Sequence, residues 1–166
     1  MAVDHQANDL FEAFLTLTRQ GCLLFVDLQN TLEQEQLVLQ QRDLEALRQN
    51  TQTKQQLLLA IEANIRERNS LLVQAGCSPS ESGFKAFTEL MPEAIRQMTM
   101  TEWHQLQKLL MNVRTASQRN EQILVRSKQN VDQLLSLLQG HQGSNVLYDP
   151  GGGKGNYAAQ RRIGKA

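Results

Sequence analysis

The sequence predicts an all-α protein: an antiparallel bundle of three long helices plus a short connecting helix, followed by a disordered C-terminal tail. No proline occurs before Pro79 or between Pro92 and Pro150, so long stretches are free to be helical. Within them apolar residues recur every three to four positions, the spacing of one helix face. The 166 residues include 26 leucines and 22 glutamines, which is typical of long helices with a leucine seam and uncharged polar outer faces.

The first long helix is expected at about residues 8–41. Its main stripe consists of Leu10, Phe14, Leu17, Gly21, Leu24, Leu28 and Thr31. Gly21 has two interpretations: it is tolerated there, at about 1 kcal/mol relative to alanine, or it lets a partner helix approach closely. We favour the close approach, because the residues beside it in the stripe are bulky.

The second long helix is expected at about residues 44–75, antiparallel to the first. An unbroken helix through both segments would be about 95 Å long and could not be covered, so a hairpin is predicted at residues 41–43. Asp43 can cap the new helix by accepting a hydrogen bond from a first-turn amide, and Gly76 can end it in a left-handed conformation. The stripe of this segment consists of Leu37, Leu44, Leu47, Thr51, Leu58, Ile61, Ile65 and Leu72.

A short helix is expected at about residues 82–91, in the connection to the last long helix. Ser80 or Ser82 can cap it, and the next proline would stop it. Phe84 and Phe87 lie on this helix and are interpreted as a plug that closes one end of the bundle; a binding site is the alternative.

The longest helix is predicted at residues 99–139, and the other helices are expected to lie along it. Thr99 and Glu102 match a capping box, in which each side chain satisfies the backbone amide of the other residue. The seam consists of Trp103, Leu106, Leu110, Val113, Ser117, Asn120, Leu124, Ser127, Val131, Leu134 and Leu138. Ser117 and Asn120 put polar groups in this seam, where such residues often fix the register between helices. A polar ligand site inside the bundle is the alternative.

The helical domain is predicted to cover residues 1–141 and the flexible tail residues 142–166. The last 22 residues contain five glycines and few large apolar side chains, so they cannot bury enough surface to offset the entropy of ordering them. Four basic side chains in this segment oppose Asp149 alone, so the tail is basic.

The sequence offers no candidate for enzyme activity, a cofactor or a metal site. His5, His104 and His141 lie in unrelated segments, and none has the glutamate spacing of di-iron bundles. The glycine-rich run at 151–155 lacks the Ser/Thr, the preceding strand and the following helix of a phosphate-binding loop. Formal net charge is zero, and we expect neither a signal peptide nor a transmembrane helix. These features predict a cytoplasmic protein without membrane insertion or nucleic-acid binding.

Four parts of the chain carry a resemblance to a known family. They are Gln41–Leu47 at the hairpin, Trp103–Leu106, Leu134–Leu138, and Leu147–Asp149 with the glycine-rich run leading to Arg161–Ala166. Together they resemble the FlgN family of flagellar export chaperones over nearly the whole chain. The family often has Asn-Gly in the middle of the long helix, whereas here Asn120 is followed by Glu121, which leaves open whether this helix bends.

The resemblance implies a chaperone of the flagellar type III export system. Such a protein would bind the hook-associated (hook–filament junction) subunits FlgK and FlgL, prevent their premature assembly or degradation, and deliver them to the export apparatus for flagellum assembly. As a hypothesis, a leucine groove and the tail hold a terminal helix of the subunit. The groove residues are Val131, Leu134, Leu135 and Leu138, the apolar tail anchors are Leu147, Tyr148, Tyr157 and Ile163, and the basic tail residues are Arg161, Arg162 and Lys165. Bundle core is the alternative for the leucines, and a solvated end without function is the alternative for the tail.

Two other functional classes compete with this interpretation. A structural coiled-coil adaptor or self-assembling helical bundle with no export role predicts concentration-dependent homo-oligomers; a homodimer is compatible with either class. A nucleic-acid-binding protein could use the basic tail, but its few cations allow few phosphate contacts and the net negative charge of the remaining chain opposes them.

Overall fold

The computed structural model describes the backbone of residues 2–138 and the side-chain burial of residues 7–136. This part of the chain contains no strand and four helices: α1 (Ala2–Gln41), α2 (Leu44–Gln74), α3 (Glu81–Glu89) and α4 (Glu93–Leu138). The prediction of an all-α bundle with three long helices and a short connecting helix is therefore confirmed. The chain divides into two compact units, Met1–Ser127 and Lys128–Ala166.

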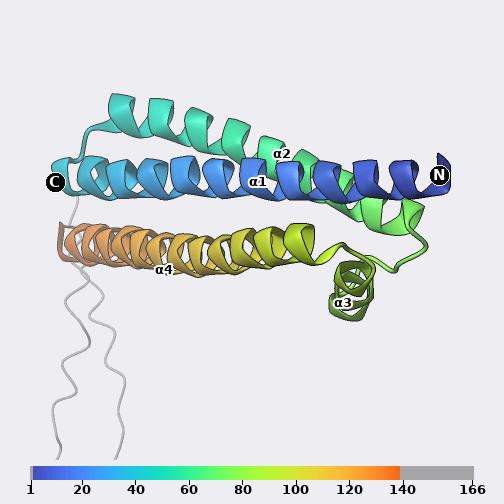
Figure 1. The fold of residues 1–166 in the computed structure, drawn as a ribbon. Helices are drawn as coiled ribbons and strands as arrows, with labels where there is room; N and C mark the ends of the chain where they lie inside the picture. Colours follow the sequence, from blue (N-terminus) through green and yellow to red (C-terminus); the bar gives the residue numbers. More distant parts are fainter. Residues whose placement is uncertain (1, 139–166) are drawn as a thin grey trace, which may run out of the picture. The chain divides into compact units, whose positions relative to one another are not determined.

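Within the first unit the three long helices pack lengthwise in an up–down–up order. The α1–α2 hairpin turns the chain back on itself, so α2 is antiparallel to α1 (Figure 1). Arg19 pairs with Glu102, and the Asn120 amide reaches the carbonyl of Leu32, so residue numbers rise in the same direction along α1 and α4. These contacts make α4 parallel to α1.

Local signals set the ends of α2 where the sequence placed them. The side chain of Asp43 accepts a hydrogen bond from the Ala46 N–H at 3.0 Å, which confirms the predicted cap. Arg42 has a φ of 58°, so a non-glycine residue takes the left-handed position in this tight turn. At the other end Gly76 has a φ of 77° and donates its N–H to the carbonyl of Val73 at 2.9 Å. This is the predicted left-handed stop.

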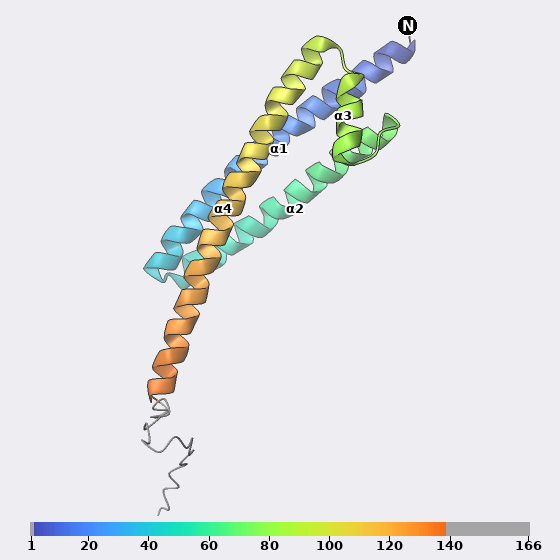
Figure 2. The same cartoon turned by 90° about the horizontal axis from the view of Figure 1, so that it is seen from below.

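The short helix α3 lies at the end of the unit where α2 ends and α4 begins (Figure 2). Phe84 stacks on Trp103 with ring centroids 4.2 Å apart, and Phe87 is fully buried against Phe11 and Phe14. The interpretation of the α3 phenylalanines as a plug at one end of the bundle is confirmed.

The start of α4 differs from the prediction. Ser80 caps α3 as expected, accepting a hydrogen bond from the Gly83 N–H at 3.1 Å. However, α4 begins at Glu93, directly after the proline that separates it from α3, so Thr99 is a fully buried residue inside the helix and forms no capping box. Ile95 packs on a cluster of buried residues at this end of the unit, which we call the aromatic end cluster: Phe11, Phe14, Leu72, Phe84, Phe87 and Met91. The partial burial of Ile95 favours the additional helical turns.

The central core lies between α1, α2 and α4. It consists of Cys22, Phe25, Leu28, Leu32, Ile61, Leu106, Leu109, Val113 and Ala116. A Cβ added to Gly21 beside this core would lie 3.0 Å from Asn64 Oδ1 and 3.4 Å from Leu106 Cδ1. Gly21 therefore permits the close approach of neighbouring helices that the sequence predicted.

Part of the apolar pattern does not enter this core. Ten side chains that the spacing assigned to buried stripes are exposed: Leu37, Leu44, Leu58, Ile65, Leu110, Ser117, Leu124, Ser127, Val131 and Leu134. The predicted stripe of α2 is thus only partly correct: Leu44, Leu58 and Ile65 are exposed, and the buried residues of this helix are Ile61, Asn64, Arg68 and Leu72. These two polar side chains take core positions because α1 and α4 supply partners for them.

Candidate binding site

A buried polar group joins the three long helices and fixes how α4 packs on α1. Asn120 is 2% exposed, and its amide donates to the Leu32 carbonyl at 2.7 Å and to Glu35 Oε2 at 2.9 Å. The other carboxylate oxygen of Glu35 accepts a hydrogen bond from Lys54 of α2. A buried carboxylate with these partners is satisfied only in one register of the helices. The expected role of Asn120 in register is thus supported by its partners, whereas Ser117 is exposed and has no such role.

A second polar group lies closer to α3. Asn64 donates to the Leu17 carbonyl at 2.8 Å and accepts a hydrogen bond from Arg68 Nε at 3.0 Å. The Arg68 guanidinium lies 5.4 Å from the centre of the Trp103 ring, a cation–π geometry. Burial lowers the pKa of Arg68, but a guanidinium stays charged over the physiological range. Both polar groups are structural: their hydrogen bonds are made within the chain.

The predicted groove residues lie on the last described turns of α4, within the second unit. Val131, Leu134 and Leu135 are between 47% and 60% exposed. With Leu138 they follow the i, i+3, i+4, i+7 spacing that places side chains on one helix face. The alternative, that these leucines are ordinary bundle core, does not hold for the three residues whose burial is described. Apolar side chains displayed in this way are available to a partner.

The remaining predicted site residues cannot be placed. The side chain of Leu138 and the tail residues Leu147, Tyr148, Tyr157, Arg161, Arg162, Ile163 and Lys165 lie outside the described part of the chain. Their proposed roles stay predictions.

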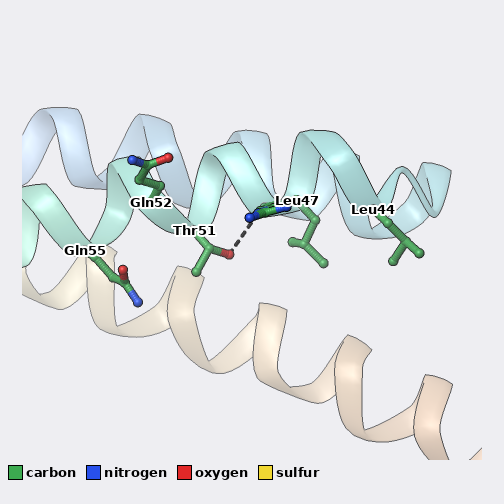
Figure 3. A pocket seen from close by; sticks show the side chains of 6 residues that line it. Leu44, Leu47, Thr51, Gln52 and Gln55 are labelled. Atoms are coloured by element: carbon green, nitrogen blue, oxygen red, sulfur yellow. Dashed lines mark hydrogen bonds between the residues drawn. The ribbon is translucent and has the colours of Figure 1, made fainter.

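The structure adds a second exposed apolar surface, which sequence reasoning had assigned to the core. Leu44, Leu58 and Ile65 on α2 and Leu110 on α4 have exposures between 40% and 79%. One hollow of this surface lies along the start of α2 and is lined by Leu44, Leu47, Arg48, Thr51, Gln52 and Gln55 (Figure 3). The seven-residue spacing was visible in the sequence, but it could not show which side of α2 faces the core.

Among the described residues there is no cluster of three metal-ligating side chains, and none of their helices is long and apolar enough to cross a membrane. Cys22 is buried beside the Glu102 carbonyl, and burial, followed by the negative charge of Glu102, raises the pKa of its thiol. A thiol with a raised pKa is a poor nucleophile, so Cys22 serves as a small core residue.

Comparison with known proteins identifies the family of this chain. The family model described as FlgN protein matches residues 2–156. The chain belongs to the FlgN family. The FlgN family is a family of flagellar export chaperones and not of enzymes. Membership of this family gives the protein a general role as a chaperone in flagellum assembly and export. Searches of curated proteins and of solved structures found no match.

Proposed function

We propose that this FlgN-family protein is a cytoplasmic chaperone for the hook–filament junction subunits FlgK and FlgL. It covers a terminal amphipathic helix of the subunit, prevents premature assembly or degradation, and delivers the subunit to the flagellar export apparatus. The observation that carries the proposal is the exposed leucine face of α4, Val131, Leu134 and Leu135, in a chain that belongs to a family of export chaperones.

The chemistry of this face suits a helical ligand. An amphipathic helix binds by laying its own i, i+3, i+4, i+7 residues against an apolar strip. Each leucine side chain that becomes fully covered contributes about 1.5–3 kcal/mol of transfer free energy, part of which is lost in ordering the ligand. In the proposal the basic tail adds pairing with acidic groups of the subunit or the export machinery, through Arg161, Arg162 and Lys165.

Titration calorimetry with peptides covering each terminal helix of the cognate FlgK, and with the corresponding FlgL peptides, tests the leucine face. We expect the double variant Leu134→Ser/Leu135→Ser to weaken binding about tenfold or more. The matched control is Met111→Ser, an exposed apolar residue elsewhere on α4 with the same 60% exposure as Leu134. Equal affinity of the double variant and the control would remove the leucine face from the proposal.

The tail is tested separately in the full chain. Leu147→Ser/Tyr148→Ser should weaken subunit binding without changing helicity or Tm, because it removes the proposed anchors and no described core residue. Binding that survives this change assigns recognition to the helices alone. If neither FlgK nor FlgL binds the wild-type chain, while light scattering shows concentration-dependent homo-oligomers, the structural coiled-coil adaptor becomes the better account.

A further inference from the structure

Two rows of residues in the first unit share a spacing of seven and carry exposed leucines and an isoleucine. The α2 row consists of Leu44, the half-buried Thr51, Leu58 and Ile65, and the α4 row of Leu110, Ser117 and Leu124, so each row has one polar residue between its apolar ones. A seven-residue interval returns to nearly the same side of a helix after two turns, so each row is a continuous strip. Heptad rows of this kind normally lie against another helix, yet the partner helix is absent from the first unit.

The rows are continuous with the surface on which α3 is seated. A hollow beside α3 is lined by residues of α2, α3 and α4, among them Asn69 and Leu72 of α2 and Trp103 and Gln107 of α4. Leu72 follows Ile65 by seven residues, and Trp103 precedes Leu110 by seven. The α2 and α4 rows therefore lead, at one end of the unit, to the hollow beside α3.

α3 shows that a short amphipathic helix can cover the Trp103 end of the α4 row. Phe84 of α3 stacks on Trp103 with ring centroids 4.2 Å apart, whereas Phe87 packs on Phe11 and Phe14 of α1. The other side of α3 faces solvent. Beyond α3 the strip continues along α2 to the hollow at Leu44, where Leu47, Thr51 and Gln55 project from one side of the helix (Figure 3). From Asn69 to Leu44 the distance along α2 is about 37 Å, the length of a helix of about 25 residues.

We propose that the α2 and α4 rows bind an amphipathic helix of the exported subunit, placed beside α3. The inference rests on the proposed chaperone function and adds a second helix-binding surface to the leucine face of α4. The ligand presents leucine-type side chains at i, i+3 or i+4 and i+7 to the rows. Its flanks are polar, because the two hollows are edged by Gln52, Gln55 and Gln107 together with the charged residues Arg48, Glu81 and Lys85.

A second copy of this chain fits the strip less well than a single helix does. Both ends of the strip are hollowed, and two hollow surfaces related by a two-fold axis are not complementary in shape. A strip one helix wide also offers less area than the roughly 1,200–2,000 Å² of a stable protein–protein interface, whereas a helix ligand is held by such a strip.

Adjacent residues supply a matched pair of variants for the test. Leu58 and Leu110 lie in the rows and are 49% and 50% exposed, whereas Leu59 and Met111 point about 100° away on the same helices and are 66% and 60% exposed. We expect Leu58→Ser/Leu110→Ser in the full chain to weaken binding of a fluorescent FlgK terminal-helix peptide about tenfold or more. Leu59→Ser/Met111→Ser should stay within about twofold. Equal affinities of the two double variants would overturn the inference.

A second measurement leaves the apolar residues intact. A photo-cross-linking amino acid at Gln55, which lines the hollow of α2, should capture the FlgK peptide, and the same group at the neighbouring Gln56 should not. Capture at both positions, or at neither while the peptide is bound, would overturn the inference. This readout also remains decisive if the serine variants lower stability.

The outcomes separate this inference from the proposed function. If the wild-type chain binds and Leu134→Ser/Leu135→Ser weakens binding while Leu58→Ser/Leu110→Ser does not, the rows are excluded and the proposed function stands. If the wild-type chain binds no FlgK or FlgL segment, both fail together. If light scattering shows a dimer that Leu58→Ser/Leu110→Ser converts to a monomer, the rows belong to a second copy and the inference is overturned.

Discussion

Replacing Asn120 by alanine probes the contact that holds α4 in register with α1. The Asn120 amide donates to the Leu32 carbonyl at 2.7 Å and to Glu35 Oε2 at 2.9 Å, and its side chain is 2% exposed. The variant leaves one oxygen of a buried carboxylate without its donor. A hydrogen bond to a charged group contributes about 1.5–3 kcal/mol, and the space left by the amide adds to the loss. We expect the free energy of unfolding to fall by about 2–4 kcal/mol.

Urea unfolding followed by far-UV circular dichroism measures this change. In a thermal melt the same loss corresponds to a Tm lower by about 5–12 °C. Ser117→Ala is the control, because Ser117 lies one turn away on α4 but is exposed, and it should change the free energy of unfolding by less than about 0.5 kcal/mol. A double-mutant cycle of Asn120→Ala with Glu35→Ala should show a coupling of about 1 kcal/mol or more. If Asn120→Ala is as mild as Ser117→Ala, the polar group does not hold the helices together.

Two further predictions concern the packing of α1. Gly21→Ala should lower the free energy of unfolding by about 1 kcal/mol, since overpacking against Asn64, which two hydrogen bonds hold in place, outweighs the gain in helix propensity; a variant more stable than wild type in urea would contradict the close approach. Cys77 should react with iodoacetamide before Cys22 at mildly alkaline pH, as mass spectrometry can show, because burial raises the pKa of the Cys22 thiol. The raised pKa means that the unfolded chain releases the Cys22 proton at a lower pH than the folded chain does. The free energy of unfolding should therefore fall as the pH rises above the ordinary thiol pKa. A Cys22→Ala variant should lose this part of the pH dependence of stability.

The helix ends were predictable because they depend on a few neighbouring residues. Asp43 and Ser80 cap from their own positions, and Gly76 ends α2 because it alone avoids the steric cost of a positive φ there. The start of α4 was missed because it depends on distant residues: Ile95 is partly buried by packing on the aromatic end cluster, which includes residues of α1 and α2.

The candidate binding surfaces were only partly predictable. Spacing alone put Leu134 and Leu135 on one helix face, and the structure shows that the two are exposed. The same spacing predicted that Leu58 and Leu110 lie in the bundle core, but the structure shows both side chains exposed. A periodic pattern reveals that a face is apolar, but it is silent on whether the face is covered by the same chain or by another.

The sequence by itself determined that this chain is helical, where its hairpin and short helix lie, and that leucine rows run along the helices. These properties follow from local backbone preferences and from the 3.6-residue period of the helix. Only the tertiary structure decided which rows are buried. It placed Asn64, Arg68 and Asn120 in the interior, because α1 and α4 offer a carbonyl, a carboxylate and an aromatic ring at bonding distance. A polar side chain can be buried in the core when hydrogen-bonding or aromatic partners lie within reach, and only folding brings those partners together.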